Sequence, residues 1–286
     1  MTIPLISDYP TRERSALSLP LISVVTTVRN AEETLQRTID SVRQQSIPGL
    51  EYIIVDAGST DRTVDIIRAN LDIVTFWKSE RDRGISDGFN KGIALAHGKY
   101  VLLLNGDDWL SPNQLMFALE TLETTGAGFV FGDLAYHTAT GAEIHRIQGE
   151  ADYRQRISHV MPGLNHPTVI VRRELYERLG LFDLEFRLAM DYELLLRFHR
   201  AHCDGVYDPR ILGHMTLEGV SDRNAARTLR EVRIAAIRHG FPPARAWPRY
   251  AWRIFKLKCH LAAAYLPRTA YVWLRRKFNQ NYVASP

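Results

Sequence analysis

The chain has 286 residues, of which 45% are hydrophobic and 24% are charged, as in a globular protein with one large or two small domains. Its two cysteines, Cys203 and Cys259, lie far apart without CxxC spacing, which argues against a disulfide framework or a zinc knuckle and favours a reducing compartment. Residues 1–19 lack the apolar core of a signal peptide, and no apolar run reaches the roughly 20 residues that cross a bilayer.

The net charge of +4 conceals an asymmetry along the chain. Residues 223–286 contain 14 Lys and Arg residues and a single acid, Glu231, whereas the rest of the chain holds 22 basic and 31 acidic residues. An acidic body with a basic tail indicates that the tail meets a polyanion, either a membrane surface or a nucleic acid.

Apolar, β-branched runs alternate with helical patterns over the first hundred residues. We predict strands at 21–28, 51–55, 73–77 and 100–104. We predict helices after Asn30, which is placed to cap the first of them with Glu33 three residues later, from about 61 to 71, and over 86–97. This alternation predicts an α/β fold with a mostly parallel central sheet flanked by helices.

The pattern is looser after residue 108. We predict helices at 112–123, 173–179 and 191–202, and short strands at 129–131 and 167–171.

The fourth predicted strand ends in Asn105-Gly106-Asp107-Asp108, where two carboxylates stand side by side. Adjacent carboxylates repel each other unless a cation or a shared proton relieves them, and Mg²⁺ commonly binds one or two carboxylates together with substrate phosphates. The strand end therefore indicates a metal–nucleotide site. The alternative is that Asp107 or Asp108 caps a helix near Pro112.

The turn after the first strand contains no GxGxxG sequence, and the chain has no Walker motif. A glycine loop therefore does not cradle a pyrophosphate at the first strand. The Asp pair with its metal could neutralise a phosphate instead.

The basic tail has the pattern of an amphipathic helix. An apolar, aromatic face includes Trp247, Tyr250, Ile254 and Leu257, and continues beyond Pro267 through Tyr271, Leu274 and Phe278. Arg249, Arg253, Lys256 and His260 occupy the opposite face. Such a helix fits either contact with a membrane surface or packing on the protein body with a solvated basic face. Nucleic-acid binding is disfavoured, because the apolar face explains the aromatic residues.

Three stretches, LISVVTTVRN, IIVDAGSTDRT and SERDRGISDGFNKGIALAHGKYVLLLNGDD, together resemble the family 2 glycosyltransferases. The resemblance is strong over residues 21–108, resumes in NHPTVIVRRELYERLGLFD and AMDYELLLR, and fades after Ser221. Among these enzymes the chain is most similar to the branch that assembles bacterial surface polysaccharides and glycolipids. The resemblance implies a GT-A fold, a divalent metal (Mn²⁺ or Mg²⁺), a UDP- or GDP-sugar donor and inversion at the anomeric carbon.

The resemblance also implies roles for particular residues. Thr27, Arg29, Asp56, Arg83 and Asn105 would bind the nucleotide-sugar, and Asp107, with Asp108, would hold the metal. Asp56 could alternatively form an Asx-turn on Gly58 and Ser59, and Arg29 and Arg83 could be surface residues. Ala57 and Asn105 depart from the acidic residues common in the family at these positions.

Asp191 is the expected general base, with Glu193 as the fallback, although Met190 replaces the first acid of the family's usual pair. An N-cap is the alternative role for Asp191. Asp87 and Asn90 are expected to support the adjoining loop, His166 to lie near the acceptor, and His214 to approach the metal or the diphosphate. Residues 218–221 resemble a loop that closes over the donor.

These observations together predict an inverting, metal-assisted glycosyltransferase that transfers a sugar to a hydroxyl of a saccharide or lipid-linked acceptor. We expect it in the cytoplasm, with the tail as a peripheral contact on the inner face of the membrane. The expected parts are an extension (1–19), a nucleotide-sugar-binding half (20–115), an acceptor-binding half (116–222) and a basic helical extension (223–286). The alternatives are a nucleotidyltransferase or a non-catalytic nucleotide-sugar- or membrane-binding module.

Overall fold

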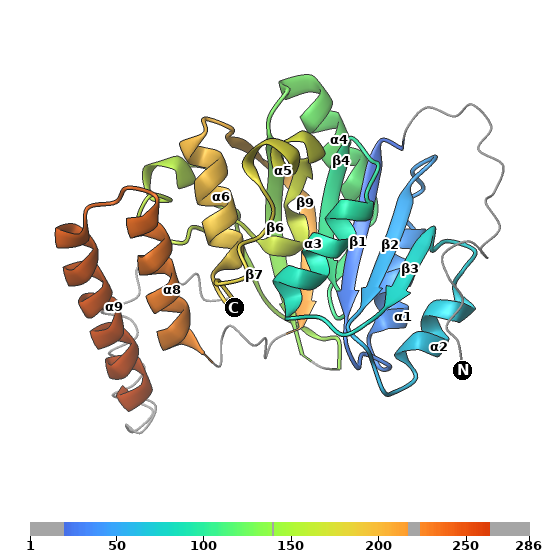
Figure 1. Ribbon diagram of the computed structural model, residues 1–286, viewed down its shortest axis with the longest axis horizontal. Coiled ribbons are helices and arrows are strands. Elements are labelled where there is room, and N and C mark those ends of the chain that lie inside the picture. Colours follow the sequence, from blue (N-terminus) through green and yellow to red (C-terminus); the bar gives the residue numbers. More distant parts are fainter. Residues whose placement is uncertain (1–19, 139, 217–223, 264–286) are drawn as a thin grey trace.

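The computed structural model describes residues 20–138, 140–216 and 224–263. Nine strands of this part of the chain form one sheet in the order β3-β2-β1-β4-β8-β6-β9-β5, with β7 paired to β6 (Figure 1). The strands are β1 Ile22–Val28, β2 Glu51–Asp56, β3 Phe76–Ser79, β4 Tyr100–Asn105, β5 Trp109–Leu110, β6 Phe129–His137, β7 Glu143–Ile147, β8 Ile170–Arg172 and β9 Gly205–Thr216. The helices are α1 Leu35–Arg43, α2 Thr63–Ala69, α3 Ile85–Leu95, α4 Gln114–Thr125, α5 Arg173–Leu179, α6 Met190–Arg200, α8 Ala225–Arg238 and α9 Pro243–Ala263.

The predicted α/β architecture is confirmed, and the sheet has two different halves. From β3 to β4 all pairings are parallel, as expected from the alternation of strands and helices. Beyond β4 the sheet is mixed, because β8 runs antiparallel to both β4 and β6 while β9 runs parallel to β6.

The sheet is buried on both faces by apolar side chains. Consecutive residues of a strand point to opposite faces, so Val24 packs with α1 and α4 while Val25 packs with α3. Tyr52 and Phe89, one on each face, are among the fully buried side chains. Each such large side chain contributes about 1.5–3 kcal/mol to folding, which fixes the strand ends that carry the site.

Two sequence-based element predictions are corrected, and three strands are additional to the predicted ones. The third strand lies at 76–79 rather than 73–77, because Ile73 and Val74 form a turn on the carbonyl of Asn70. Asn30 does not cap the first helix, which begins at Leu35; Asn30 has φ 49° and its side chain accepts the N–H of Thr60 at 2.9 Å. Strands β5, β7 and β9 were not predicted.

The basic extension begins with two helices that lie side by side next to α6 (Figure 1). Helix α8 packs against α6, and α9 packs against α8, so this part of the extension belongs to the folded body. Tyr250, Ile254 and Leu257 are half-buried, whereas Trp252 and Phe255 on the other side of α9 are 54% and 55% exposed. The face predicted beyond residue 263, the extension 1–19 and the loop at 218–221 lie outside the described residues.

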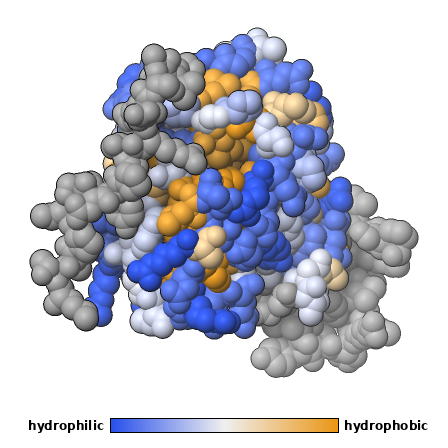
Figure 2. Space-filling model, turned by 90° about the vertical axis from the view of Figure 1, so that its right-hand side faces the viewer, coloured by the Kyte–Doolittle hydropathy of each residue, from blue (hydrophilic) through white to orange (hydrophobic). Residues whose placement is uncertain are grey.

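The surface beside β3 is mainly hydrophilic, with apolar side chains gathered towards its middle (Figure 2). Strand β3 forms this edge of the sheet and exposes Lys78 and Ser79, which disfavours pairing with the edge of another sheet. Within the described ranges, no helix combines the length and the apolar character that a bilayer crossing requires.

Candidate active site

The ends of β1, β2 and β4 place three of the predicted donor-binding residues, Thr27, Asp56 and Asn105, at one edge of the sheet. Val28 pairs with Asp56 and Thr27 pairs with Asn105 in the register of the parallel strands. The N–H of Gly106 donates to the carbonyl of Thr27 at 3.0 Å, which joins the loop after β4 to the end of β1. Side chains far apart in the sequence thus meet at the carboxyl edge of the sheet, where α/β proteins bind ligands.

Asp56 is fully buried, and both oxygens of its carboxylate already accept hydrogen bonds. It accepts hydrogen bonds from the N–H groups of Gly58 (3.2 Å) and Ser59 (3.0 Å), from the hydroxyl of Ser79 (2.5 Å) and from that of Ser59. The Asx-turn is therefore present, and Asp56 holds the loop that follows β2. Contact between Asp56 and a nucleotide base remains a prediction.

Asp107 and Asp108 differ sharply in exposure. Asp107 is exposed, whereas Asp108 is 1% exposed and its Oδ2 accepts a hydrogen bond from Asn105 Nδ2 at 2.9 Å. The other oxygen, Asp108 Oδ1, is buried with no hydrogen-bond partner among the described residues. The N-cap interpretation is wrong, because α4 begins at Gln114 and its N-cap residue is Asn113.

The charges at this pair fit a divalent cation. Burial raises the pKa of Asp108 to about 8, and the neighbouring charge of Asp107 adds to the shift. Desolvation by the surrounding groups also raises the pKa of Asp107, although its side chain reaches solvent, and the backbone N–H of Asp107 and the charge of Arg37 oppose the rise. A cation bound to both carboxylates would satisfy the unpartnered oxygen and relieve their repulsion. The described residues contain no cluster of three or more His, Cys, Asp or Glu side chains around one metal position.

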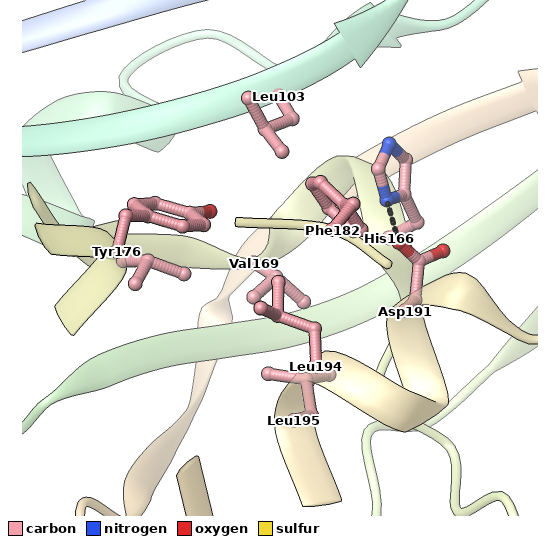
Figure 3. A pocket seen from close by; sticks show the side chains of 9 residues that line it. Leu103, His166, Val169, Tyr176, Phe182, Asp191, Leu194 and Leu195 are labelled. Carbon is pink, nitrogen blue, oxygen red and sulfur yellow. Dashed lines mark ion pairs between the residues drawn. The ribbon is translucent and has the colours of Figure 1, made fainter. Parts of the chain in front are cut away.

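Asp191 lies in the first turn of α6 beside His166, which belongs to the short 3-10 helix η3 (His166–Thr168). His166 Nδ1 is 3.2 Å from Asp191 Oδ1, and both residues line a small, mostly apolar cavity with Tyr176 and Phe182 (Figure 3). Burial alone would lower the pKa of His166, but the carboxylate of Asp191, with a smaller effect of Asp108, raises it. The charges of Asp108 and Asp191 therefore both act on the imidazole of His166.

Glu231 of α8 binds the backbone of residues 187–189, which lead into α6. One oxygen, Glu231 Oε2, accepts the N–H groups of Arg187, Leu188 and Ala189 at 3.0, 2.8 and 3.0 Å. Sequence analysis missed this role, although the only acid in a basic segment was a signal that could have revealed it. The contact fixes the backbone just before Asp191.

Helix α3 supports the same loop from the other side. Asn90 exchanges two hydrogen bonds with the backbone of Phe182, both at 2.9 Å, and Asp87 accepts the N–H of Arg83 at 3.1 Å. The predicted support of the adjoining loop is confirmed for Asp87, whereas Asn90 supports the segment after α5 instead. The guanidinium of Arg83 is exposed and bonds Asp87 at 3.2 Å, and Arg29 is also exposed.

Two predicted side chains are engaged elsewhere. Glu193 is buried in an ion-pair network with Arg197 (2.6 Å) and His239 (2.8 Å), so it is not placed as a fallback base. The ring nitrogens of His214 contact Ser111 Oγ at 2.8 Å and His137 Nε2 at 2.9 Å, and its ring stacks on Trp109. His214 therefore lacks a free nitrogen for a metal.

Solved structures share this fold. The chain matches a mannosyltransferase, PcManGT of Pyrobaculum calidifontis in complex with GDP-Man and Mn²⁺, with a TM-score of 0.64, 20% identity and coverage of 90% of this chain and 79% of that one. It matches residues 1–349 of S. aureus TarS in complex with UDP-GlcNAc with a TM-score of 0.59, 17% identity and coverage of 79% and 69%. It corresponds to 41% of the longer TarS chain. The chain therefore has the GT-A fold, as predicted.

The family-model comparison identifies the enzyme class directly. The model described as glycosyl transferase family 2 matches residues 23–180, and the chain belongs to this family. An uncharacterized glycosyltransferase of Mycobacterium tuberculosis H37Rv is 32% identical over 186 residues, which cover 63% of this chain and 69% of the relative. A PGL/p-HBAD biosynthesis glycosyltransferase of Mycobacterium bovis BCG is 26% identical over 186 residues, covering 63% and 70%.

Proposed function

We propose that this glycosyltransferase moves a sugar from a UDP- or GDP-sugar to a hydroxyl of a saccharide or lipid-linked acceptor, with inversion at the anomeric carbon. The observation that carries the proposal is the relation of Asp191 to the Asp pair: His166 contacts Asp191 and is also within the electrostatic reach of Asp108. A carboxylate near a donor diphosphate site can deprotonate an acceptor hydroxyl if it reaches the proton at about 3 Å.

In this proposal each part of the site has one role. Thr27, Arg29, Asp56, Arg83 and Asn105 bind the nucleotide-sugar. Asp107 is the principal residue that would hold the metal, and Asp108 would add its unpartnered oxygen. When bound, Mn²⁺ or Mg²⁺ neutralises the charge that builds on the departing diphosphate. Asp191 takes the acceptor proton while the hydroxyl attacks the opposite face of the anomeric carbon.

The test of the base is an Asp191→Asn variant. We expect it to bind the donor as the unaltered enzyme does and to lose transfer by about 10²–10⁴-fold, the usual contribution of a general base. A matched Asp152→Asn variant, at an exposed acid away from the site, should transfer normally. Normal transfer by Asp191→Asn would refute the assigned base.

The donor can be found by thermal unfolding with a panel of nucleotide-sugars, each with Mn²⁺ and with Mg²⁺. A ligand that binds only the folded state raises the unfolding temperature by mass action. The solved neighbours hold UDP-GlcNAc and GDP-Man, so these two donors come first. The acceptor class that we propose is a surface glycolipid or polysaccharide, supported by the named function of the M. bovis relative.

We also propose that the enzyme works in the cytoplasm, peripherally on the inner face of the membrane, and does not bind nucleic acid. The support is α9, where Trp252 and Phe255 are exposed next to Lys256. Interfacial helices combine aromatic and basic side chains in this way. The four chain divisions at 1–19, 20–115, 116–222 and 223–286 remain part of the proposal.

A Trp252→Ser/Phe255→Ser variant tests the membrane contact. It should float less with vesicles made of equal parts phosphatidylglycerol and phosphatidylcholine than the unaltered enzyme does. Leu71→Ser/Met116→Ser is the matched control, because both side chains are exposed apolar residues on other helices or turns. Equal flotation of the two variants would contradict contact through α9.

A further inference from the structure

Three arginines line a pocket between α8 and α9, away from the ends of β1, β2 and β4. Arg233 comes from α8 and Arg249 and Arg253 come from α9, and His159 adds to the wall of the pocket. The other lining residues are Leu229, Val232, Ala236, Phe241, Ala246 and Tyr250, so no acid lines the pocket. We call this feature the arginine pocket.

The guanidinium of Arg233 packs against two aromatic rings, but two of its nitrogens lack a hydrogen-bond acceptor among the described residues. Its Cζ lies 3.7 Å from the ring centre of Trp247 and 4.6 Å from that of Tyr250. Its Nε and Nη1 are buried and have no hydrogen-bond partner among the described residues. A buried donor without an acceptor is costly, and in folded proteins such a group commonly marks a missing ion or water.

The positive charges of the arginine pocket are not balanced by neighbouring acids. Burial lowers the pKa of Arg253, and the charge of Arg156 contributes in the same direction. Burial lowers the pKa of His159, and Arg249 and Arg253 lower it further. In the described parts of the chain, none of the three arginines forms an ion pair with a carboxylate.

The nearby acids already have other partners. Glu150 pairs with Arg156 at 2.5 Å, Glu193 pairs with Arg197 and His239, and Glu231 accepts backbone N–H groups of the loop before α6. The cations of the pocket therefore lack a counter-charge from α6, from α8 or from the segment after β7.

We propose that the arginine pocket binds a phosphate group. Guanidinium groups donate paired hydrogen bonds that match phosphate oxygens, and such charge-assisted bonds are about twice as strong as neutral ones. A bound phosphate would supply acceptors to Arg233 and would relieve the repulsion between Arg249, Arg253 and Arg156. Neither the donor-binding residues nor the general base takes part in this site.

The placement of the pocket leaves two sources for the phosphate. The hydroxyl of Tyr192, the residue after Asp191, donates to the carbonyl of Ile157 at 2.8 Å, two residues before His159 of the pocket wall, so the pocket lies close to the start of α6. Exposed Trp252 and Phe255 lie on the same helix as Arg253. The phosphate belongs either to the headgroup of an anionic phospholipid or to a lipid-linked acceptor, and this second source rests on the proposed function.

The experiment compares two double variants of the full chain with the same loss of charge. Arg249→Gln/Arg253→Gln removes two cations of the pocket, whereas Arg245→Gln/Lys258→Gln removes two exposed cations of α9 outside it. Binding is measured by calorimetry with inorganic phosphate and by flotation with phosphatidylglycerol–phosphatidylcholine vesicles. We expect the pocket variant to bind about tenfold more weakly and the control to stay within about twofold of the unaltered chain. Equal losses in both variants, or no loss in the pocket variant, would overturn the site.

A second variant keeps the test decisive if the glutamine pair does not fold. Arg249→Lys/Arg253→Lys retains the charge and loses the forked donors, so it should still weaken phosphate binding. Phosphate affinity equal to that of the unaltered chain would again overturn the site. Thermal unfolding of each variant checks that the fold is intact.

Two arms distinguish the sources of the phosphate. If vesicles of phosphatidylglycerol bind in a pocket-dependent way while polyprenyl phosphate in micelles does not, the ligand is a membrane headgroup; the reverse result identifies the acceptor. Asp191→Asn should bind phosphate normally in either case. Full transfer by Asp191→Asn would therefore refute the proposed base without affecting the result for the pocket.

Discussion

His166 Nδ1 lies 3.2 Å from Asp191 Oδ1, and the ring of His166 packs 5.3 Å from that of Phe89. The histidine comes from η3 and the aspartate from α6, so the pair joins η3 to the first turn of α6. Since Nε2 is buried and has no hydrogen-bond partner within the described ranges, the polar contact of the imidazole is with the carboxylate of Asp191. We infer that His166 orients Asp191.

Replacing His166 should lower the rate of transfer without changing the affinity for the donor. His166→Phe keeps a ring against Phe89 but removes the donor to Asp191, so we expect kcat to fall about 10–100-fold with an unchanged KM for the donor. His166→Asn retains an N–H near Nδ1 and should recover most of kcat. Steady-state kinetics measure both, and equal kcat for the two variants would exclude the orienting role.

Asp107→Asn should remove the metal dependence of nucleotide binding. We expect Mn²⁺ to raise the stabilisation by UDP or GDP in the unaltered protein, and we expect this increment to be lost in the variant, because a neutral amide binds a hard cation weakly. Thermal unfolding with nucleotide, with and without Mn²⁺, measures the increment. Asp65→Asn, an exposed acid on α2, is the control. An unchanged increment in Asp107→Asn would remove Asp107 from the metal site.

Glu231→Ala should destabilise the protein and impair transfer together. Its carboxylate accepts three N–H groups of residues 187–189, and its loss leaves them, the buried N–H of Ala189 included, without this acceptor at a cost of about 2–3 kcal/mol. Urea unfolding and kcat are the measurements. Glu174→Ala, in an exposed pair with Arg178, should change the free energy of unfolding by less than about 1 kcal/mol. If both substitutions changed the free energy of unfolding and kcat equally, Glu231 would not stabilise the loop at residues 187–189.

His214 should make the fold sensitive to acid. His137 Nδ1 donates to the carbonyl of Gly141, so in the neutral pair His214 Nδ1 donates to His137 Nε2 and the Ser111 hydroxyl donates to His214 Nε2. Burial, and then the nearby His137, lower the pKa of His214 to about 4. Since this folded value is below the unfolded value of about 6.5, the contribution is present above pH 6.5 and is lost as the pH falls towards 4.

The loss should stay below about 3 kcal/mol, because solvent screens the charge of a ring that is only partly buried. His214→Gln cannot titrate, so its free energy of unfolding should fall less between pH 7 and pH 4.5 than that of the unaltered protein. Urea titrations at the two pH values give the comparison. Parallel losses in both proteins would mean that other groups cause the acid sensitivity.

Local pattern predicted the first half of the fold well, because each strand there is a continuous apolar run and each helix has its own periodicity. The exceptions have tertiary causes. Strand β9 carries Asp208, Arg210 and His214, and its polar side chains find partners on α4 and β6, so its sequence lacks the apolar run of a buried strand. Asn30 looks like a cap in sequence but bonds Thr60 across the turn after β2.

The sequence by itself determined the parallel half of the sheet, the carboxylate pair at the end of β4, the family and the basic charge of the last 64 residues, since all of these depend on residues close together in the chain. Only the tertiary structure decided that Asp108 is buried with a free oxygen, that His166 pairs with Asp191, and that Glu231 holds the loop before α6. These are contacts between segments tens of residues apart. Hydrogen bonds and burial depend on which segments lie close together in the folded chain, and local sequence patterns do not specify this.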